Sequence, residues 1–191
     1  MQPQLILASA SPRRRELLQQ IGIAHRVQTA DVDESAQTTE FPPALVQRLA
    51  RQKAEAVWQC SDQTLPVLGA DTLGVLDGEL LVKPRDFAHA RQMLLSMAGR
   101  SHIIFSAVAL CHQGGCALAL NQSQVWFRAI SEAEVQAYWD SGEPQDKAGA
   151  YGIQGLGAVL VERLEGSYSA VMGLPLFETA QLLQQHGIYP L

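Results

Sequence analysis

The sequence predicts an α/β fold in which helices pack on a mixed sheet. Short apolar runs bounded by turn residues indicate buried strands, and amphipathic segments with start and stop signals indicate helices between them. Strands and helices interleave without strict alternation, which favours a mixed sheet over a purely parallel one. The length of 191 residues, 47% of them hydrophobic, suits one domain or two lobes that share a sheet.

The N-terminal segment predicts a buried strand over residues 4–8, followed by a helix. Ser11 is expected to cap this helix, Pro12 to occupy its first position and Gly22 to close it. A second strand is predicted over residues 24–30, and the polar stretch DVDESAQTTE after it indicates a flexible loop.

The next segment predicts a long helix and an apolar strand. The helix runs from Pro42 to about Cys60, with an apolar stripe at helical spacing that Lys53 interrupts. The stretch LPVLGADT then predicts a strand that ends at an acid, Asp71. After it, TLGVLDGELLV predicts a hairpin that turns at its Asp-Gly pair.

The second half of the chain predicts elements in a mixed order. They are a helix from an Asp86 cap to Met97, strands over 102–111 and 116–129, a helix from the capping box SEAE at 131–134 to Trp139, the glycine-rich loop PQDKAGAYGIQGLG, strands near 158–164 and 168–172, and a last helix that starts at Pro175. The sequence contains no internal repeat, linker or low-complexity segment.

Charge and cysteine content narrow the class of protein. A formal net charge of -5 argues against broad binding to nucleic acids or anionic membranes, because those partners select basic surfaces. Neither a signal-peptide pattern nor an apolar run of membrane-spanning length occurs. Three cysteines, an odd number, favour reduced thiols in the cytoplasm, although Cys111 and Cys116 could face each other across a hairpin.

The stretch SASPRRR places three arginines in the first turn of the first predicted helix. Cations are disfavoured there because the N-terminus of a helix carries partial positive charge. An anion held by the serine hydroxyls, the backbone N–H groups and the arginines would remove this conflict, and phosphate is the common candidate. The alternative is that Ser11 merely caps the helix while the arginines point into solvent.

Single charged residues elsewhere allow both functional and structural interpretations. Asp71, at the predicted strand end, could face a ligand crevice or belong to a plain turn. Lys53 could line a polar pocket or extend to the surface. Glu34 could complete a magnesium site with Asp71, although acidic clusters of this kind are usually solvated loops. Lys83, taken alone, reads as an ordinary surface lysine.

Several common catalytic motifs are absent from the sequence. It contains no P-loop pattern, no GxSxG elbow and no HExxH pair. The stretch GIQGLG has neither the spacing nor the position of a dinucleotide-binding loop, because it precedes a predicted strand instead of opening a helix. These absences argue against P-loop nucleotidases, α/β-hydrolases and zinc peptidases.

Five stretches, in order along the chain, resemble the Maf family of nucleoside triphosphate pyrophosphatases. They are LASASPRRRELL, GADTLGVLDG, KPRD, DKAGAYGIQGLG and GSYSAVMGLP. The resemblance covers nearly the whole chain and implies a single domain over residues 1–191. It also implies a strongly twisted mixed sheet in two lobes around a central cleft, as in Maf and ITPase-like folds.

The resemblance implies cleavage of a nucleoside triphosphate between its α- and β-phosphates, which gives a monophosphate and pyrophosphate and uses a divalent metal, Mg or Mn. Asp71 matches the family's general base, and Asp71 and Glu34 are expected to hold the metal. The residues expected to bind the substrate phosphates are Ser9, Ser11, Arg13, Arg14, Lys53 and Lys83. The resemblance also implies that the protein is a homodimer in the cytoplasm. Its implied role is house-cleaning, the hydrolysis of unwanted nucleotides in the cellular pool.

Within the family, SPRR, GADT and YGIQG resemble the branch that acts on dTTP and UTP. Arg13, Thr72 and Gln154 match its selectivity positions. A glutamine amide offers both a donor and an acceptor to the imide edge of a pyrimidine base. Modified pyrimidine nucleotides are further candidate substrates. The alternatives are the branch that acts on 7-methyl-GTP, a non-hydrolysing regulator of septum formation, and a phosphohydrolase that releases orthophosphate.

Overall fold

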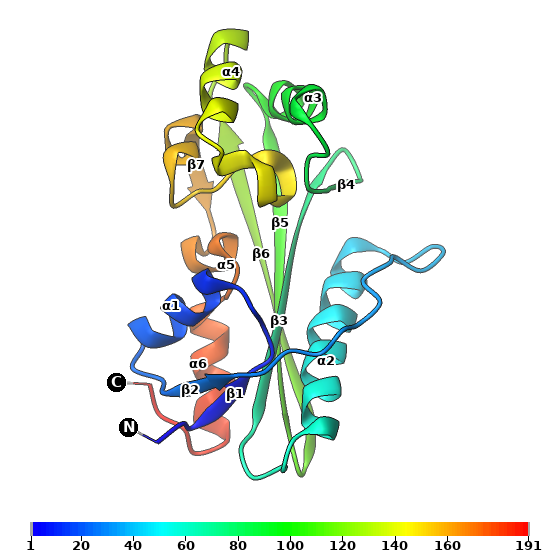
Figure 1. The fold of residues 1–191 in the computed structure, drawn as a ribbon, viewed down its shortest axis with the longest axis vertical. Helices are drawn as coiled ribbons and strands as arrows, with labels where there is room; N and C mark the ends of the chain where they lie inside the picture. The colour runs from blue at the N-terminus through cyan, green and yellow to red at the C-terminus, as the bar shows by residue number, and fades with distance from the viewer. Residues whose placement is uncertain (1, 191) are drawn as a thin grey trace. The chain divides into compact units, whose positions relative to one another are not determined.

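The computed structural model describes residues 2–190, and Figure 1 shows how the helices and strands follow one another. The strands are β1 (Leu5–Leu7), β2 (His25–Val27), β3 (Val67–Leu76), β4 (Glu79–Leu81), β5 (Ser101–His112), β6 (Gly115–Phe127) and β7 (Val161–Glu165). The helices are α1 (Pro12–Gln20), α2 (Pro42–Cys60), α3 (Phe87–Met97), α4 (Glu132–Asp140), α5 (Tyr168–Met172) and α6 (Leu176–Gln185), with 3-10 turns η1 (Glu143–Asp146), η2 (Ala148–Ala150) and η3 (Leu156–Leu160). Among the described residues, no helix combines the length and the apolar character needed to cross a membrane.

The described strands form one seven-stranded sheet with the order β2-β1-β3-β5-β6-β7, and β4 pairs with β3 off this path. Strand β1 is parallel to β2 and β3, whereas β4 is antiparallel to β3 and β7 is antiparallel to β6. Both kinds of pairing in one sheet confirm the predicted mixed α/β fold. Strand β2 is shorter than predicted, since it covers three residues of the segment 24–30.

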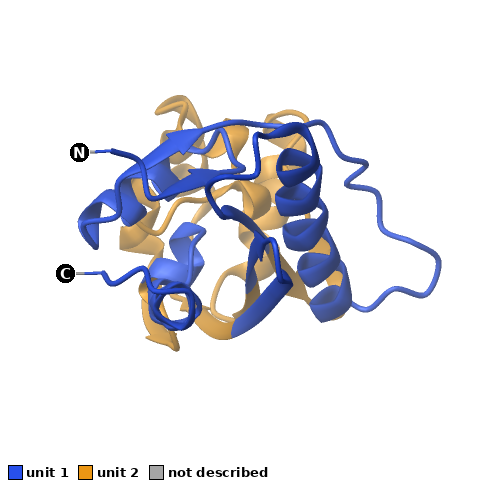
Figure 2. Ribbon diagram, turned by 90° about the horizontal axis from the view of Figure 1, so that it is seen from below, with its two compact units in different colours: residues 1–72, 106–121, 169–191 blue, residues 73–105, 122–168 orange. Residues whose placement is uncertain are grey.

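The chain divides into two compact units, which Figure 2 colours separately. The first unit contains residues 1–72, 106–121 and 169–191, and the second contains residues 73–105 and 122–168. Strands β3, β5 and β6 each contribute residues to both units. The single domain over residues 1–191 stays a prediction.

The core of the first unit forms around α1, α6 and the parallel strands. Leu17 and Leu18 of α1 are buried, as the helical pattern predicts, and they belong to one apolar cluster with Leu5 and Leu7 of β1. Two leucines of α6 complete this cluster. Gly22 follows α1 with a φ of 74°, a left-handed conformation that glycine adopts without strain, so the chain can turn back toward β2.

Helix α2 lies against β3 at a glycine. A Cβ atom on Gly69 would lie 2.7 Å from the backbone nitrogen of Ala54 and nearer still to the carbonyl oxygen of Ala50. These two alanines are four residues apart and therefore share one face of the helix. Figure 1 shows α2 running alongside the first part of β3. Small residues on both elements let the two backbones approach each other closely.

Strand β3 is longer than the sequence predicts. The expected strand ends at Asp71, but the observed strand continues to Leu76, so Asp71 lies in its middle. The extension is held by β4, which pairs with residues 74–76 of β3. The predicted hairpin turn is confirmed, because Asp77 and Gly78 have φ values of 53° and 86°, the positive values of a two-residue hairpin turn.

The second unit contains the two capped helices that the sequence predicts. The Asp86 side chain accepts a hydrogen bond from the first turn of α3, and Ser131 and Glu134 form a reciprocal capping box on α4. Phe87 of α3 and Trp139 of α4 place their ring centroids 6.0 Å apart. The glycine-rich loop after α4 winds through the three 3-10 turns and contains no long element.

Two predictions for the C-terminal part need correction. Residues 156–160 form η3, so β7 begins at Val161, three residues later than expected. Residues 168–172, predicted as a strand, form helix α5. A five-residue apolar segment fits a strand or a single helical turn equally well by pattern alone. Here the Ser167 N–H donates to the Ser123 hydroxyl at 2.9 Å, directly before α5 begins.

The hairpin of β5 and β6 brings two cysteines together. Cys111 and Cys116 face each other with Cα atoms 4.1 Å apart and are joined in a disulfide. The expectation of reduced thiols is therefore wrong for this pair, because neighbouring strands place opposite side chains within bonding distance. Cys60 is a free, exposed thiol.

A buried histidine lies in the core of the second unit. His102 is 2% exposed, and its Nε2 lies 2.7 Å from the Tyr151 hydroxyl. The Phe127 and Tyr151 rings meet the imidazole edge to face. Burial among these rings lowers the pKa of His102 to about 4, because the charged form loses its hydration.

This histidine predicts a loss of stability in mild acid. The unfolded chain binds a proton near the ordinary pKa of 6.5, whereas the folded chain resists it down to about 4. The contribution of His102 is therefore complete above pH 6.5 and falls, by about 2 to 3 kcal/mol in total, as the pH drops toward 4. Urea unfolding at pH 7.5 and pH 4.5 measures the effect. The His102→Gln variant should lose less stability than the original protein between these two values, and equal losses would contradict the assignment.

Candidate active site

Strand β3 and helix α2 together hold a buried ion pair in the first unit. Asp71 points from the middle of β3, two residues after Gly69 and therefore on the same face of the strand. Lys53 of α2 donates to Asp71 Oδ1 at 2.6 Å, and the two side chains are only 15% and 12% exposed. The break in the apolar stripe of α2 is thus explained by a partner acid on the strand.

Glu34 reaches the same lysine from the loop before α2. Its Oε1 lies 2.6 Å from Lys53 Nζ, although its own side chain is 62% exposed. One ammonium group therefore contacts two carboxylates, those of Glu34 and Asp71. The acidic loop is not simply solvated, because one of its carboxylates is drawn onto the lysine.

Arg48, which no motif in the sequence marks, fastens this loop to α2. Its guanidinium makes a two-pronged contact with Glu40, with both distances at 2.8 Å, and Nη2 also donates to the Ser35 carbonyl at 2.9 Å. The Arg48 contact lowers the pKa of Glu40. Because Ser35 follows Glu34 directly, this anchor helps to determine where Glu34 lies. A single arginine on a helix carries no sequence signal for such a role.

The start of α1 differs from the predicted serine cap. Ser11 occupies the N-cap position, but its side chain makes no capping hydrogen bond, and its N–H donates to the Ser9 hydroxyl at 3.3 Å. Arg14 donates to Ser9 Oγ at 3.1 Å and, through Nε, to the Gly173 carbonyl at 2.8 Å. Ser9 and Arg14 are therefore brought together, and Arg14 connects the serine turn to the segment between α5 and α6.

The charges at the start of α1 interact with the two acids. The pKa of Arg14 is lowered, mainly because burial disfavours its charged form. The negative charges of Asp71 and Glu34 act to raise this pKa, and the positive charge of Arg13 acts to lower it. Arg14 therefore interacts electrostatically with both carboxylates and with the neighbouring arginine. Arg15 is exposed, whereas Arg13 and Arg14 are partly buried. Within the first unit, Arg14 therefore interacts electrostatically with Asp71 and Glu34, the two carboxylates that contact Lys53, and also binds Ser9.

The remaining candidate residues have simpler surroundings. Thr72, next to Asp71, is partly buried and shares a hydrogen bond with the buried Ser106 hydroxyl at 2.8 Å. Lys83 and Gln154 belong to the second unit and are exposed. Lys83 follows Val82, whose carbonyl accepts a hydrogen bond from the N–H of Gly149 in the glycine-rich loop, at 3.0 Å.

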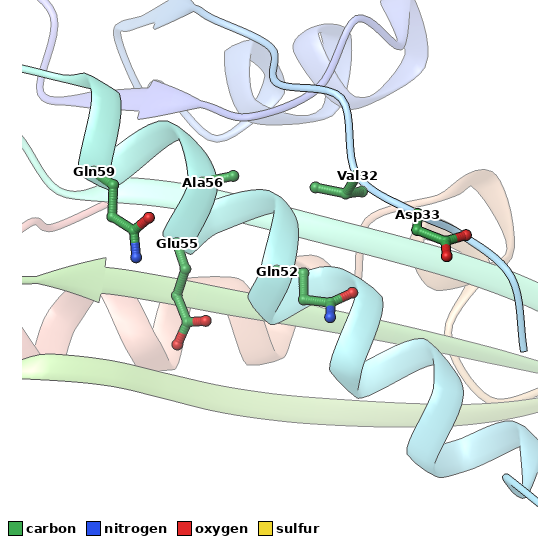
Figure 3. Close-up of a pocket in the computed structure, with 6 residues that line it drawn as sticks. All are labelled: Val32, Asp33, Gln52, Glu55, Ala56 and Gln59. Atoms are coloured by element: carbon green, nitrogen blue, oxygen red, sulfur yellow. The ribbon is translucent and has the colours of Figure 1, made fainter. Parts of the chain in front are cut away.

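An open pocket with a volume of about 290 Å³ lies between α2 and the loop that precedes it (Figure 3). Its walls are Val32, Asp33, Gln52, Glu55, Ala56 and Gln59. Two acids and no cation line this space, so its charge would repel a triphosphate. The pocket therefore does not take over the role predicted for the serine turn and the arginines.

The carboxylates of Asp71 and Glu34 fit a hard divalent metal such as Mg or Mn. Both already surround one cation, the Lys53 ammonium. Magnesium in particular is commonly held by one or two carboxylates, with water and substrate phosphates in the other positions. The donor atoms of Glu55, Cys111 and Cys116 also lie within 4.8 Å of one another, but the two sulfurs are bonded together and offer no thiolate pair.

The fold and the site define an α/β protein in which acidic and basic side chains of the first unit lie on β3, on α2 and at the start of α1. Residues 4–186 match the family model described as Maf-like protein. The chain therefore belongs to the Maf family.

Relatives of known designation match nearly the full length of the chain. A protein of Hahella chejuensis named dTTP/UTP pyrophosphatase is 50% identical over 96% of this chain and 92% of its own length. Proteins with the same name from Aliivibrio fischeri and Vibrio cholerae are each 49% identical, over 97% and 95% of this chain and over 99% and 97% of their own lengths. A solved nucleoside-triphosphatase / dITP/XTP pyrophosphatase from Mycobacterium abscessus covers 95% of this chain and 93% of its own, with 14% identity and a TM-score of 0.49, too distant to support conclusions.

Proposed function

We propose that this protein hydrolyses dTTP and UTP to the nucleoside monophosphate and pyrophosphate. The observation that carries the proposal is the contact of one lysine, Lys53, with the carboxylates of Asp71 and Glu34. Both carboxylates also interact electrostatically with Arg14, in the first turn of α1. The names of relatives that are about 50% identical over nearly the whole chain support it. Modified pyrimidine nucleotides are included as candidate substrates of the same site.

Asp71 is the residue proposed to act on water. Its carboxylate is nearly buried and lies in the middle of a strand, which fits a group that must orient a water molecule and accept its proton. Lys53 holds the carboxylate in one position through a 2.6 Å contact. The attacked atom is the α-phosphorus, and the bond that breaks joins the α-phosphorus to the oxygen that leaves with pyrophosphate.

The cations are proposed to stabilise the charge that grows on the phosphates. Arg13, together with the hydroxyls of Ser9 and Ser11, is proposed to hold phosphate oxygens at the N-terminus of α1. Arg14 supports them, since two of its donors already bind Ser9 and the Gly173 carbonyl. Lys53 and Lys83 are the further phosphate-binding groups of this proposal.

Asp71 and Glu34 are the residues that would hold a divalent metal, Mg or Mn. A bound metal supplies neutralisation of the triphosphate charge and polarises the phosphorus centre. The chain itself contributes the two carboxylate oxygens, and Lys53 keeps the carboxylates close to each other.

Thr72, Gln154 and Arg13 are the residues proposed to select pyrimidine bases. We also propose that the enzyme works as a homodimer in the cytoplasm, where nucleoside triphosphates are made and used.

The proposal is tested by following the products from a panel of triphosphates. The panel contains dTTP, UTP, dCTP, ATP, GTP and 7-methyl-GTP, each with Mg or Mn. Release of pyrophosphate, with kcat/KM highest for dTTP and UTP, is the expected result. A preference for 7-methyl-GTP would move the protein to the other branch. Release of orthophosphate would make it a general phosphohydrolase, and tight binding without turnover would make it a regulator.

A further inference from the structure

The carboxylate of Glu143, which directly precedes the glycine-rich loop, is the centre of a hydrogen-bond cluster that includes the end of this loop. Its Oε1 accepts from the Tyr138 hydroxyl at 2.7 Å and from the Gly157 N–H at 3.0 Å. Its Oε2 accepts from the Leu156 N–H at 2.7 Å. The Tyr138 oxygen in turn accepts from the Gly152 N–H at 3.1 Å. All five residues lie in the second unit.

These contacts hold the backbone on both sides of the turn that carries Gln154. The Gly155 N–H donates to the Gly152 carbonyl at 3.3 Å, which closes a turn with Gln154 as one of its two central residues. Tyr138 binds the backbone at the start of this turn, and Glu143 binds the backbone immediately after it. The exposed Gln154 side chain thus projects from a turn that one carboxylate and one phenol hold at both ends.

Glycines allow the loop backbone to wrap directly around the carboxylate. A Cβ atom on Gly155 would overlap the Glu143 carboxylate, and one on Gly157 would lie 2.5 Å from the Tyr138 hydroxyl. A Cβ atom on Gly152 would lie 2.9 Å from the Lys147 side chain. The glycines of YGIQGLG therefore leave room for Glu143 and its partners. They are not a phosphate-binding loop of the dinucleotide type.

Electrostatics agree with a charged Glu143 in this position. Burial acts to raise its pKa, but the hydrogen bonds from Gly157, Tyr138 and Leu156 outweigh that effect and lower it below the ordinary value. Burial, together with the hydrogen bond to the same carboxylate, raises the pKa of Tyr138, so the phenol stays protonated and keeps donating. At neutral pH the cluster is one anion satisfied by three donors.

We propose that Glu143 is a positioning residue for base selection, which acts by fixing the turn that carries Gln154. This inference rests on the proposed function. A glutamine amide can discriminate bases only if its donor and acceptor keep one orientation, because a freely turning amide pairs with many partners. The long, exposed Gln154 side chain cannot supply this rigidity by itself. The backbone clamp of Glu143 and Tyr138 supplies it.

The Glu143→Gln variant tests the proposal. The amide keeps the size of the side chain but offers only one accepting atom, so a backbone N–H of the loop loses its partner. The ratio of kcat/KM for UTP to that for ATP should fall about 10-fold, mainly through a higher KM for UTP. The kcat for UTP should stay within about 3-fold of the original value, because Glu143 touches no reacting atom. Glu132→Gln on α4, which neutralises an exposed acid paired with Arg91, is the matched control and should leave the ratio unchanged.

A double-mutant cycle with Gln154→Ala separates positioning from general damage. In the Gln154→Ala background, Glu143→Gln should change the UTP-to-ATP ratio by less than about 2-fold, because the residue that it positions is already gone. Equal effects in both backgrounds, or an unchanged ratio in Glu143→Gln alone, would overturn the inference. If Glu143→Gln does not fold, Tyr138→Phe removes one donor from the same carboxylate and takes its place in the cycle. An original protein that lacks any preference for UTP would instead refute the proposed function, and this inference with it.

Discussion

The Asp71→Asn variant is expected to release pyrophosphate from UTP at least about 100-fold more slowly than the original protein. The amide has nearly the same shape as the carboxylate but cannot accept a proton from water at neutral pH. The fold should survive, because Lys53 keeps its second carboxylate partner, Glu34, at 2.6 Å. Nucleotide binding should also survive, since the change removes a negative charge near the triphosphate and leaves the arginines of α1 in place.

Two measurements and one control make this prediction decisive. Single-turnover release of pyrophosphate reports the chemical step, and calorimetric titration with a non-hydrolysable UTP analogue reports binding. Asp77→Asn is the matched control, because Asp77 follows the same strand, is exposed and pairs only on the surface with Arg100. Its turnover should stay within about 2-fold of the original value, as surface ion pairs contribute little. Pyrophosphate release that is unchanged in Asp71→Asn would remove Asp71 from the proposed mechanism.

Two positions where the sequence departs from local helix preferences, Lys53 and the arginines of α1, make contacts in the first unit that explain part of the departure. A lysine in an apolar helical stripe predicts either a polar pocket or an extended surface residue, and Lys53 is observed in contact with two carboxylates. Arginines at a helix N-terminus predict a compensating partner. The structure provides part of that compensation within the protein, because Arg14 binds Ser9 and the Gly173 carbonyl. Such conflicts are visible in sequence because propensity and burial are local properties.

Long-range partners could not be predicted in the same way. Glu143 lies between a glycine and a proline in a polar turn, and its pattern resembles any solvated loop acid. Its role becomes visible only when residues 13 and 14 positions later fold back onto it. Arg48 is similar, since its contacts to Glu40 and Ser35 depend on the path of an irregular loop. Tertiary contacts of this kind have no period in the sequence and leave no signal there.

The secondary-structure predictions for short segments were wrong for a different reason. The segment 168–172 contains tyrosine and valine, which favour strands, yet it forms α5. Five residues make only about one helical turn, so intrinsic propensity differs little between the two states and the neighbouring contacts decide. The stretch LPVLGADT predicts a strand that ends at Asp71, where the continuous apolar run stops. The pairing of β4 with residues 74–76 carries the strand past it.

Gly69→Ala should destabilise the first unit by about 1 to 3 kcal/mol and also impair the site. The added methyl group would lie 2.7 Å from the Ala54 backbone nitrogen and closer still to the Ala50 carbonyl oxygen. Backbone atoms of a helix cannot rotate away as a side chain can, so α2 must move off β3. Lys53 belongs to that helix and is expected to withdraw from Asp71, which should lower pyrophosphate release from UTP as well.

Gly74→Ala in the same strand separates this backbone clash from the general effect of an added methyl group. Its new Cβ would meet side chains and no backbone atom: Leu81 Cδ1 at 2.9 Å, Ile104 Cδ1 at 3.2 Å and Leu81 Cβ at 3.3 Å. The two closest of these atoms are side-chain ends, which can shift. Replacing glycine also reduces the entropy of the unfolded chain, so this variant should stay within about 1 kcal/mol of the original. Urea unfolding compares the two variants, and equal losses would show that α2 does not depend on contact with Gly69. The expected difference follows from which atoms a methyl group meets, since flexible side chains yield where a helix backbone cannot.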